Sequence, residues 1–189
     1  AFLIADVSGK GLGGALLTTI VQGALLGVTA GADAPGIFRT LNRFFHEHAE
    51  VDRYATMFFG IMDPAGRLEF INAGHPSPLL LRKGVVSRPF TEGSFPVGLI
   101  PEADYASVAW QLEPGDTMVL FSDGVTEAAA VDSEEHMFGV QHLCEVVAGQ
   151  DETPLDRLQQ MILDAVTTFT RGAPRSDDIT LLLIRYLGL

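Results

Sequence analysis

The chain has 189 residues, 47% of them hydrophobic, and a formal net charge of −12 from 12 basic and 24 acidic residues. This length and composition predict one globular domain and exclude a disordered chain, while the scattered basic residues argue against a nucleic-acid-binding protein. The single cysteine, Cys144, excludes an internal disulfide and favours a reducing, cytoplasmic location.

The N-terminal part is predicted to contain a buried strand over residues 1–6, a glycine-rich loop over 8–11, and helices over about 12–31 and 35–48. The uncharged run 11–32 is long enough to cross a bilayer. It is interrupted by glycines and threonines and lacks a flanking aromatic belt, so a buried helix of a soluble domain is the better interpretation. Because the chain opens inside an apolar strand, we expect it to be part of a longer protein.

The region after residue 53 is rich in short apolar runs separated by turn signals. Residues 63–66 and 113–116 have the composition of tight turns, and short connections of this kind predict antiparallel pairing. The expected strands cover residues 54–62, 67–73, 79–82, 85–90, 106–112 and 117–122.

Two further helices and a strand complete the predicted elements. One helix covers about 140–148, and the next begins with Thr153 as its N-cap and Pro154 at its first position. Residues 179–186 are predicted to form a strand that is apolar on both faces until Arg185, which predicts a central place in a sheet. Helix pairs around a run of hairpins indicate an α+β fold with a layered antiparallel core.

Three apolar strands end in aspartate: Asp6, Asp123 and the pair Asp177–Asp178. Each strand carries its carboxylate to the rim of the core. Carboxylates gathered at one rim repel each other by about 4 kcal/mol for a pair 4 Å apart at an effective dielectric near 20. A hard divalent cation with oxygen ligands is the usual way to offset this repulsion.

The loop Gly9–Gly14 also matches the dinucleotide-binding pattern G-x-G-x-x-G, with Asp33 about twenty residues further on. That fold needs a second parallel strand ending at the acidic residue, whereas a helix is predicted to run almost directly into Asp33. Asp6 would also repel a pyrophosphate at this place. The interpretation we favour is a tight turn that packs the following helix against the sheet.

Four ordered motifs carry a resemblance that covers nearly the whole chain. The chain resembles the SpoIIE/RsbU-type serine phosphatases, the bacterial branch of the metal-dependent phosphatase-2C-like (PPM) superfamily. The resemblance implies one domain over 1–189, built as a sandwich of two antiparallel β-sheets flanked by pairs of α-helices. The motifs are Ile4–Gly11 (IADVSGKG), Asn72–Pro76 (NAGHP), Phe121–Ala128 (FSDGVTEA) and Asp177–Leu181 (DDITL).

The resemblance also implies a site with two Mg²⁺ or Mn²⁺ ions. Its ligands would be the carboxylates of Asp6, Asp123 and Asp177 and the backbone carbonyl of Val7, and the three aspartates are also the catalytic residues that the resemblance implies. Asp178 is the less favoured member of its pair. The implied reaction is hydrolysis of phosphoserine or phosphothreonine by a metal-activated water.

His75 lies in a turn rich in glycine and proline, and we expect it to have a structural hydrogen-bonding role rather than to act as a general acid. One departure from the family concerns the start of the chain. The family's Gly-Gly-Asp motif on an earlier strand is absent from this sequence, so we expect the N-terminal strand or strands of the domain to be missing and this piece alone to be weakly active or inactive.

The partners implied by the resemblance are a phosphorylated regulatory protein, such as a STAS-type anti-sigma-factor antagonist, and an upstream sensory domain. No nucleic acid and no membrane segment are expected, and a homodimer is left open. Two alternatives stand beside the phosphatase: a non-catalytic interaction domain that keeps the fold with an incomplete metal site, and a phosphohydrolase acting on small molecules.

Overall fold

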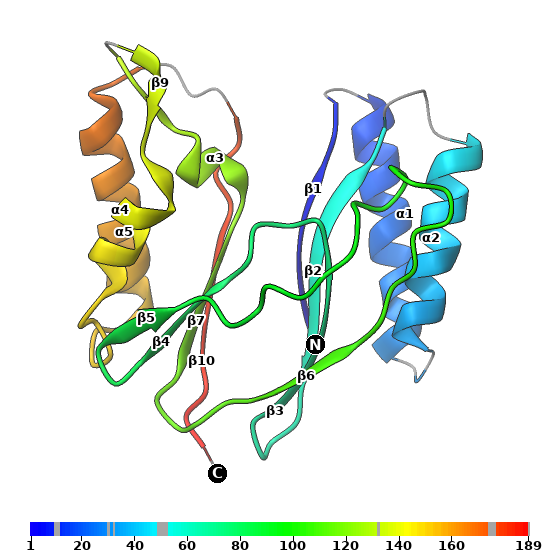
Figure 1. The fold of residues 1–189 in the computed structure, drawn as a ribbon, viewed down its shortest axis with the longest axis horizontal. Coiled ribbons are helices and arrows are strands. Elements are labelled where there is room, and N and C mark those ends of the chain that lie inside the picture. Colours follow the sequence, from blue (N-terminus) through cyan, green and yellow to red (C-terminus); the bar gives the residue numbers. More distant parts are fainter. Residues whose placement is uncertain are drawn as a thin grey trace. The chain divides into compact units, whose positions relative to one another are not determined.

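A computed structural model describes residues 1–9, 12–29, 31, 33–48, 53–131, 133–173 and 177–188. The chain divides into two compact units, and in each a four-stranded antiparallel sheet packs against two helices (Figure 1). Unit 1 comprises Ala1–Asp63, Arg67–His75 and Glu92–Gln111, and unit 2 comprises Pro64–Gly66, Pro76–Thr91 and Leu112–Leu189.

Unit 1 has the strand order β1-β2-β3-β6, with every neighbouring pair antiparallel. Buried Phe38 and Phe45 of one helix pack with Met57 and Phe59 of the sheet. Met57 and Phe59 are two residues apart on one strand and therefore face the same way, so this face of the sheet is covered by the helices. The elements are β1 (Phe2–Val7), α1 (Leu12–Thr29), α2 (Ala34–His48), β2 (Ala55–Met62), β3 (Arg67–Ala73) and β6 (Val108–Gln111).

Unit 2 has the strand order β10-β7-β4-β5 and a separate two-stranded sheet, β8-β9. Leu158, Ile162 and Val166 recur every four residues on one helix and are buried against Val119 and Phe121 of the sheet. The elements are β4 (Leu79–Arg82), β5 (Val85–Ser87), β7 (Thr117–Phe121), α3 (Asp123–Thr126), β8 (Ala129–Ala130), β9 (Ser133–Met137), α4 (Gly139–Val147), α5 (Leu155–Thr170) and β10 (Leu181–Arg185).

The predicted α+β class with antiparallel sheets is confirmed, and three local predictions are wrong. Strand β10 lies at the edge of its sheet and not at its centre. The turn at 113–116 forms, with the amide of Asp116 donating to the carbonyl of Glu113 (3.0 Å), but the strands on either side of it belong to different sheets. The N-cap residue of α5 is Pro154 and not Thr153. The hydroxyl of Thr153 donates to the side chain of Gln150 (2.7 Å) and does not cap the helix.

The structure also decides between interpretations of the N-terminal region. Strand β1 pairs antiparallel with β2, which excludes a parallel dinucleotide-binding unit at the Gly9 loop. Asp33 has a different role, since its carboxylate accepts a hydrogen bond from the amide of Gly36 (2.8 Å) in the first turn of α2. None of the helices in the described ranges has both the length and the apolar character that a bilayer crossing requires. Lys10 and Gly11 of the predicted loop lie outside the described residues.

Candidate metal centre

Asp6 and Val7 form the last two positions of β1 in unit 1. Asp6 pairs in register with Thr56 of β2, and Val7 pairs with Ala55. Beyond the strand, the amide of Ser8 donates to the carbonyl of Tyr54 (2.9 Å), and the hydroxyl oxygen of Ser8 accepts from the amide of Tyr54 (2.8 Å). These two bonds extend the pairing past Asp6, so the end of β1 is held against β2 at the point where the carboxylate emerges.

Arg53, which precedes β2, provides a second attachment for the same strand end. Its guanidinium donates to the carbonyl oxygen of Ser8 (2.9 Å). A Cβ atom added to Gly9 would overlap this guanidinium, and Gly9 has a positive φ of 87°. Only glycine therefore leaves room for the arginine and adopts this backbone angle without strain. We name the contact of Arg53 with Ser8 and Gly9 the arginine clamp.

In unit 2, Ser122 joins the ends of β7 and β10. Its amide donates to the carbonyl of Thr180 (3.0 Å), and its hydroxyl donates to the carbonyl of Asp178 (2.9 Å) while accepting from the amide of Thr180 (2.9 Å). Ser122 is only 4% exposed. The residue that precedes Asp123 is thus fully engaged with the residues that follow Asp177, and we call this set of bonds the serine junction.

Gly124 brings the same two segments into close contact. A Cβ atom added there would overlap the carbonyl oxygen of Asp178 and lie 3.0 Å from its carbonyl carbon. The half-buried Asp123 is the first residue of α3, and its backbone carbonyl accepts from the amide of Glu127 (2.8 Å). The exposed Asp177 carboxylate accepts from the amide of Asp178 (2.8 Å). The backbones that carry Asp123 and Asp177 therefore lie side by side within unit 2.

The donor chemistry at these positions suits a hard divalent cation. Asp6, Asp123 and Asp177 offer carboxylate oxygens, and Val7 offers a backbone carbonyl, which are ligands that Mg²⁺ and Mn²⁺ accept. Asp6 and Val7 belong to unit 1, and Asp123 and Asp177 belong to unit 2. Within the described part of either unit taken singly, no three Asp, Glu, His or Cys side chains form a group able to hold a metal.

His75 is buried, with 4% of its surface exposed, and its hydrogen bonds are those of a structural residue. Its Nδ1 lies 2.9 Å from the hydroxyl of Thr56, the register partner of Asp6. Asn72 brackets the same turn, because its side chain accepts from the amide of His75 (2.9 Å) and donates to the carbonyl of His75 (3.1 Å). These contacts agree with the structural role predicted for His75.

Two of the contacts described above were not predicted from the sequence. Ser122 belongs to one of the four motifs, but the sequence assigns it no role of its own. Arg53 lies outside all four motifs. The bonds of Ser122 reach residues 56 and 58 positions away, and the bond from Arg53 reaches a residue 45 positions away. No local sequence signal marks either contact, since both depend on which strands become neighbours.

Comparison with known proteins gives a consistent result. The sequence profile of the family described as Stage II sporulation protein E (SpoIIE) matches residues 1–187. Phosphoserine phosphatase RsbU of Bacillus subtilis is 26% identical over 187 residues, which cover 96% of this chain and 54% of that protein. The chain spans about half or less of the length of the curated relatives it matches.

Solved structures share the fold. The SiaA-PP2C domain of Pseudomonas aeruginosa superimposes with a TM-score of 0.81 at 21% identity, covering 97% of this chain and 74% of that one. The catalytic domain of the serine/threonine protein phosphatase PstP, solved in complex with two manganese ions, has a TM-score of 0.68 at 15% identity and covers 96% of this chain and 85% of that one.

Proposed function

The chain belongs to the SpoIIE family, and we propose that residues 1–189 form the phosphatase domain of a metal-dependent protein serine/threonine phosphatase. The observation that carries the proposal is the serine junction, which places the backbones of Asp123 and Asp177 side by side at the ends of two neighbouring strands. A turn with a purely structural role does not need aspartates at the ends of two neighbouring strands. A cation site does need several oxygen ligands at one place.

The proposed metal ligands are Asp6, the carbonyl of Val7, Asp123 and Asp177, and the proposed cofactors are two Mg²⁺ or Mn²⁺ ions. A chain with a net charge of −12 repels a phosphate dianion, and the acidic strand ends would add to this repulsion without cations. When bound, the divalent ions would neutralise that charge and lower the pKa of a bound water toward about 7.

The protein's own residues have the task of holding these ligands in place. The serine junction fixes the backbone of Asp178 and thereby the preceding Asp177, and the arginine clamp fixes the residues after Asp6 and Val7. The carboxylates bind and orient, and the proposed hydrolysis needs no nucleophilic side chain and no covalent intermediate on the protein.

The proposed substrate is a phosphoserine or phosphothreonine of a regulatory protein, of the kind represented by STAS-type anti-sigma-factor antagonists. Support comes from the relatives RsbU and RsbP, which are named phosphoserine phosphatases. We place the reaction in the cytoplasm and expect a sensory domain elsewhere in the same protein. These statements concern the whole protein, of which the described domain is the catalytic part.

Turnover of a synthetic phosphoserine peptide by the full-length protein in the presence of Mn²⁺ tests the proposal. We expect Mn²⁺-dependent release of phosphate that is abolished by Asp123→Asn. Asp104→Asn is the matched control, because Asp104 is an exposed aspartate that pairs with Arg39 and is not a proposed ligand. Absence of Mn²⁺-dependent turnover by the unaltered protein, or full turnover by Asp123→Asn, would contradict the proposal and favour a non-catalytic domain.

A further inference from the structure

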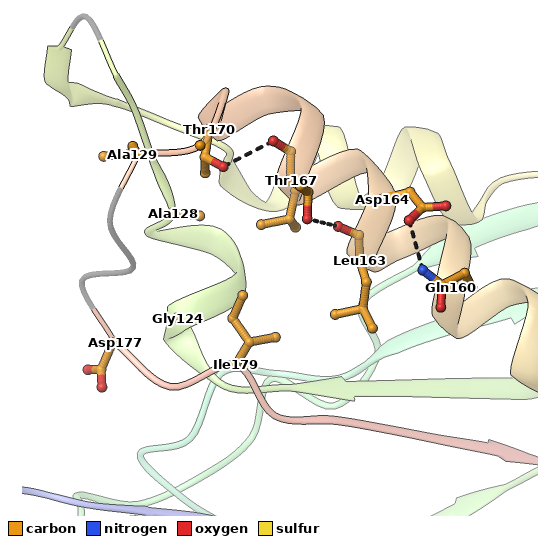
Figure 2. Close-up of a pocket in the computed structure, with 13 residues that line it drawn as sticks. Gly124, Ala128, Ala129, Gln160, Leu163, Asp164, Thr167, Thr170, Asp177 and Ile179 are labelled. Atoms are coloured by element: carbon orange, nitrogen blue, oxygen red, sulfur yellow. Dashed lines mark hydrogen bonds between the residues drawn. The ribbon is translucent and has the colours of Figure 1, made fainter.

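A pocket of about 380 Å³ lies within unit 2, between α5 and the segments that contain Ala129 and Asp177 (Figure 2). Asp177, a proposed metal ligand, is at its rim. The size falls in the lower part of the range of ligand pockets, which suits one long side chain with its backbone better than a folded element. The pocket therefore adjoins one of the proposed metal ligands, and its described lining belongs to unit 2.

Small residues keep this pocket open. Ala128 and Ala129 line the side opposite α5, and Gly172 is also part of the lining. Val166 of α5 turns into the core, whereas Thr167 is exposed toward the pocket. The apolar part of the lining, which includes Leu163 and Ile179, provides a surface against which the methylene groups of a long side chain can pack.

The polar part of the lining presents hydrogen-bond acceptors. The hydroxyls of Thr167 and Thr170 donate to the carbonyls of Leu163 (2.8 Å) and Thr167 (3.1 Å), so their oxygens remain acceptors toward the pocket. Asp164 accepts from the amide of Gln160 (2.8 Å) and keeps further acceptor sites. The described residues that line the pocket include two carboxylates and no Lys, Arg or His.

We propose that this pocket binds an arginine or lysine side chain of the phosphoprotein substrate, while the phosphoserine of the same substrate is held at the proposed metal site. The proposal rests on the phosphatase function proposed above. The hydroxyl and carboxylate oxygens of Thr167, Thr170 and Asp164 are acceptors that match the donors of a guanidinium or ammonium group, and Asp164 supplies the opposite charge. The same acidic lining disfavours an acidic segment, so the pocket selects among phosphoproteins by the charge of residues near the phosphoserine.

Phosphoserine peptides that contain one arginine two, four or six residues from the phosphoserine test this proposal, beside a matched peptide with alanine in its place. For the best-placed arginine we expect kcat/KM to exceed that of the alanine peptide by about three- to fivefold, as one exposed ion pair allows. Asp164→Asn is expected to bring this ratio close to one, and Asp164→Lys to reverse it. Asp156→Asn, an exposed aspartate in the first turn of the same helix, is the control that keeps the ratio.

Two further measurements separate this proposal from the phosphatase function itself. p-Nitrophenyl phosphate has no side chain for the pocket, so the loss caused by Asp164→Asn on the arginine peptide must exceed any loss on this small substrate by the same three- to fivefold factor. An arginine preference that survives Asp164→Asn would overturn the proposal. Should the protein hydrolyse neither substrate, the phosphatase proposal fails, and fluorescence anisotropy of the labelled arginine peptide still decides the pocket: weaker binding by Asp164→Asn supports it, and equal binding overturns it.

Discussion

The acidic strand ends of unit 1 and unit 2 are held by contacts of different kinds. In unit 1 a charged side chain, Arg53, reaches across to Ser8 and lies over Gly9. In unit 2 a buried hydroxyl, that of Ser122, bonds two backbone segments, and Gly124 lets them touch. A guanidinium on a flexible chain can move away from a clash, whereas a backbone carbonyl held by a hydrogen bond cannot do so without displacing its own segment.

This difference predicts that the strand end of unit 2 is the less tolerant of change. The largest effect is expected for Gly124→Ala, whose new methyl group would overlap the carbonyl oxygen of Asp178. We expect the free energy of unfolding to fall by about 2 to 3 kcal/mol and Mn²⁺ binding to weaken, measured by urea unfolding and calorimetry. Gly23→Ala is the control, because a methyl group there meets nothing within 4 Å and favours helix α1.

Ser122→Ala is expected to have the next largest effect. It removes the hydroxyl that bonds Asp178 and Thr180, so that the amide of Thr180 and the carbonyl of Asp178 each lose a partner in a partly buried place. The expected loss is about 2 kcal/mol of unfolding free energy, with weaker Mn²⁺ binding. Ser87→Ala, which alters a 3.5 Å contact on β5, should change neither quantity measurably. Equal effects of the two substitutions would refute the role given to the serine junction.

The arginine clamp of unit 1 is expected to contribute less. Gly9→Ala and Arg53→Ala should each lower the unfolding free energy by about 1 to 1.5 kcal/mol, the first through its positive φ and the displaced guanidinium, the second through the lost hydrogen bond. Because both disrupt the same contact, the double variant should lose less than the sum of the two. Strict additivity in a double-mutant cycle would show that the clamp is not one unit.

Raising the pH is expected to lower the stability of unit 1 without altering the acidic strand end of either unit. Burial raises the pKa of Tyr105, whose hydroxyl donates to Asn42 (3.1 Å). The folded state therefore keeps this proton longer than the unfolded state, so the contribution to stability is complete below the ordinary pKa near 10 and is lost as the pH rises above it. We expect a loss of about 1 kcal/mol between about pH 9 and pH 11, and a flatter dependence in Tyr105→Phe. An unchanged slope would remove Tyr105 as the cause.

Much of the secondary structure follows from local patterns in the sequence. Strands β2 and β3 and helix α2 have nearly the predicted bounds, because their apolar periods are long and are bounded by turn or proline signals. The sequence does not predict helix α3 or strands β8 and β9. The turn before β7 has the same local chemistry whether its strands pair or enter separate sheets, so the sequence does not distinguish these cases.

The sequence predicts the acids of the candidate site but not the contacts that support them. Asp6, Asp123 and Asp177 stand out because each lies at one end of an apolar strand. Their neighbours are set by long-range register, as in the approach of Gly124 to Asp178, which no pattern within either segment indicates. The prediction that β10 is a central strand was wrong for a related reason. An apolar sequence shows that both faces of a strand are covered, but it does not show whether the strand has a hydrogen-bonded neighbour on both sides.

The central claim is that Asp6, Asp123 and Asp177 bind the same divalent ions. Calorimetric titration of the protein and its Asp→Asn variants with Mn²⁺ tests it most directly. We expect each of the three substitutions to weaken Mn²⁺ binding by at least about tenfold, while Asp178→Asn, one residue away, leaves it nearly unchanged. Binding that survives all three substitutions, or that is lost equally in Asp178→Asn, would contradict the claim.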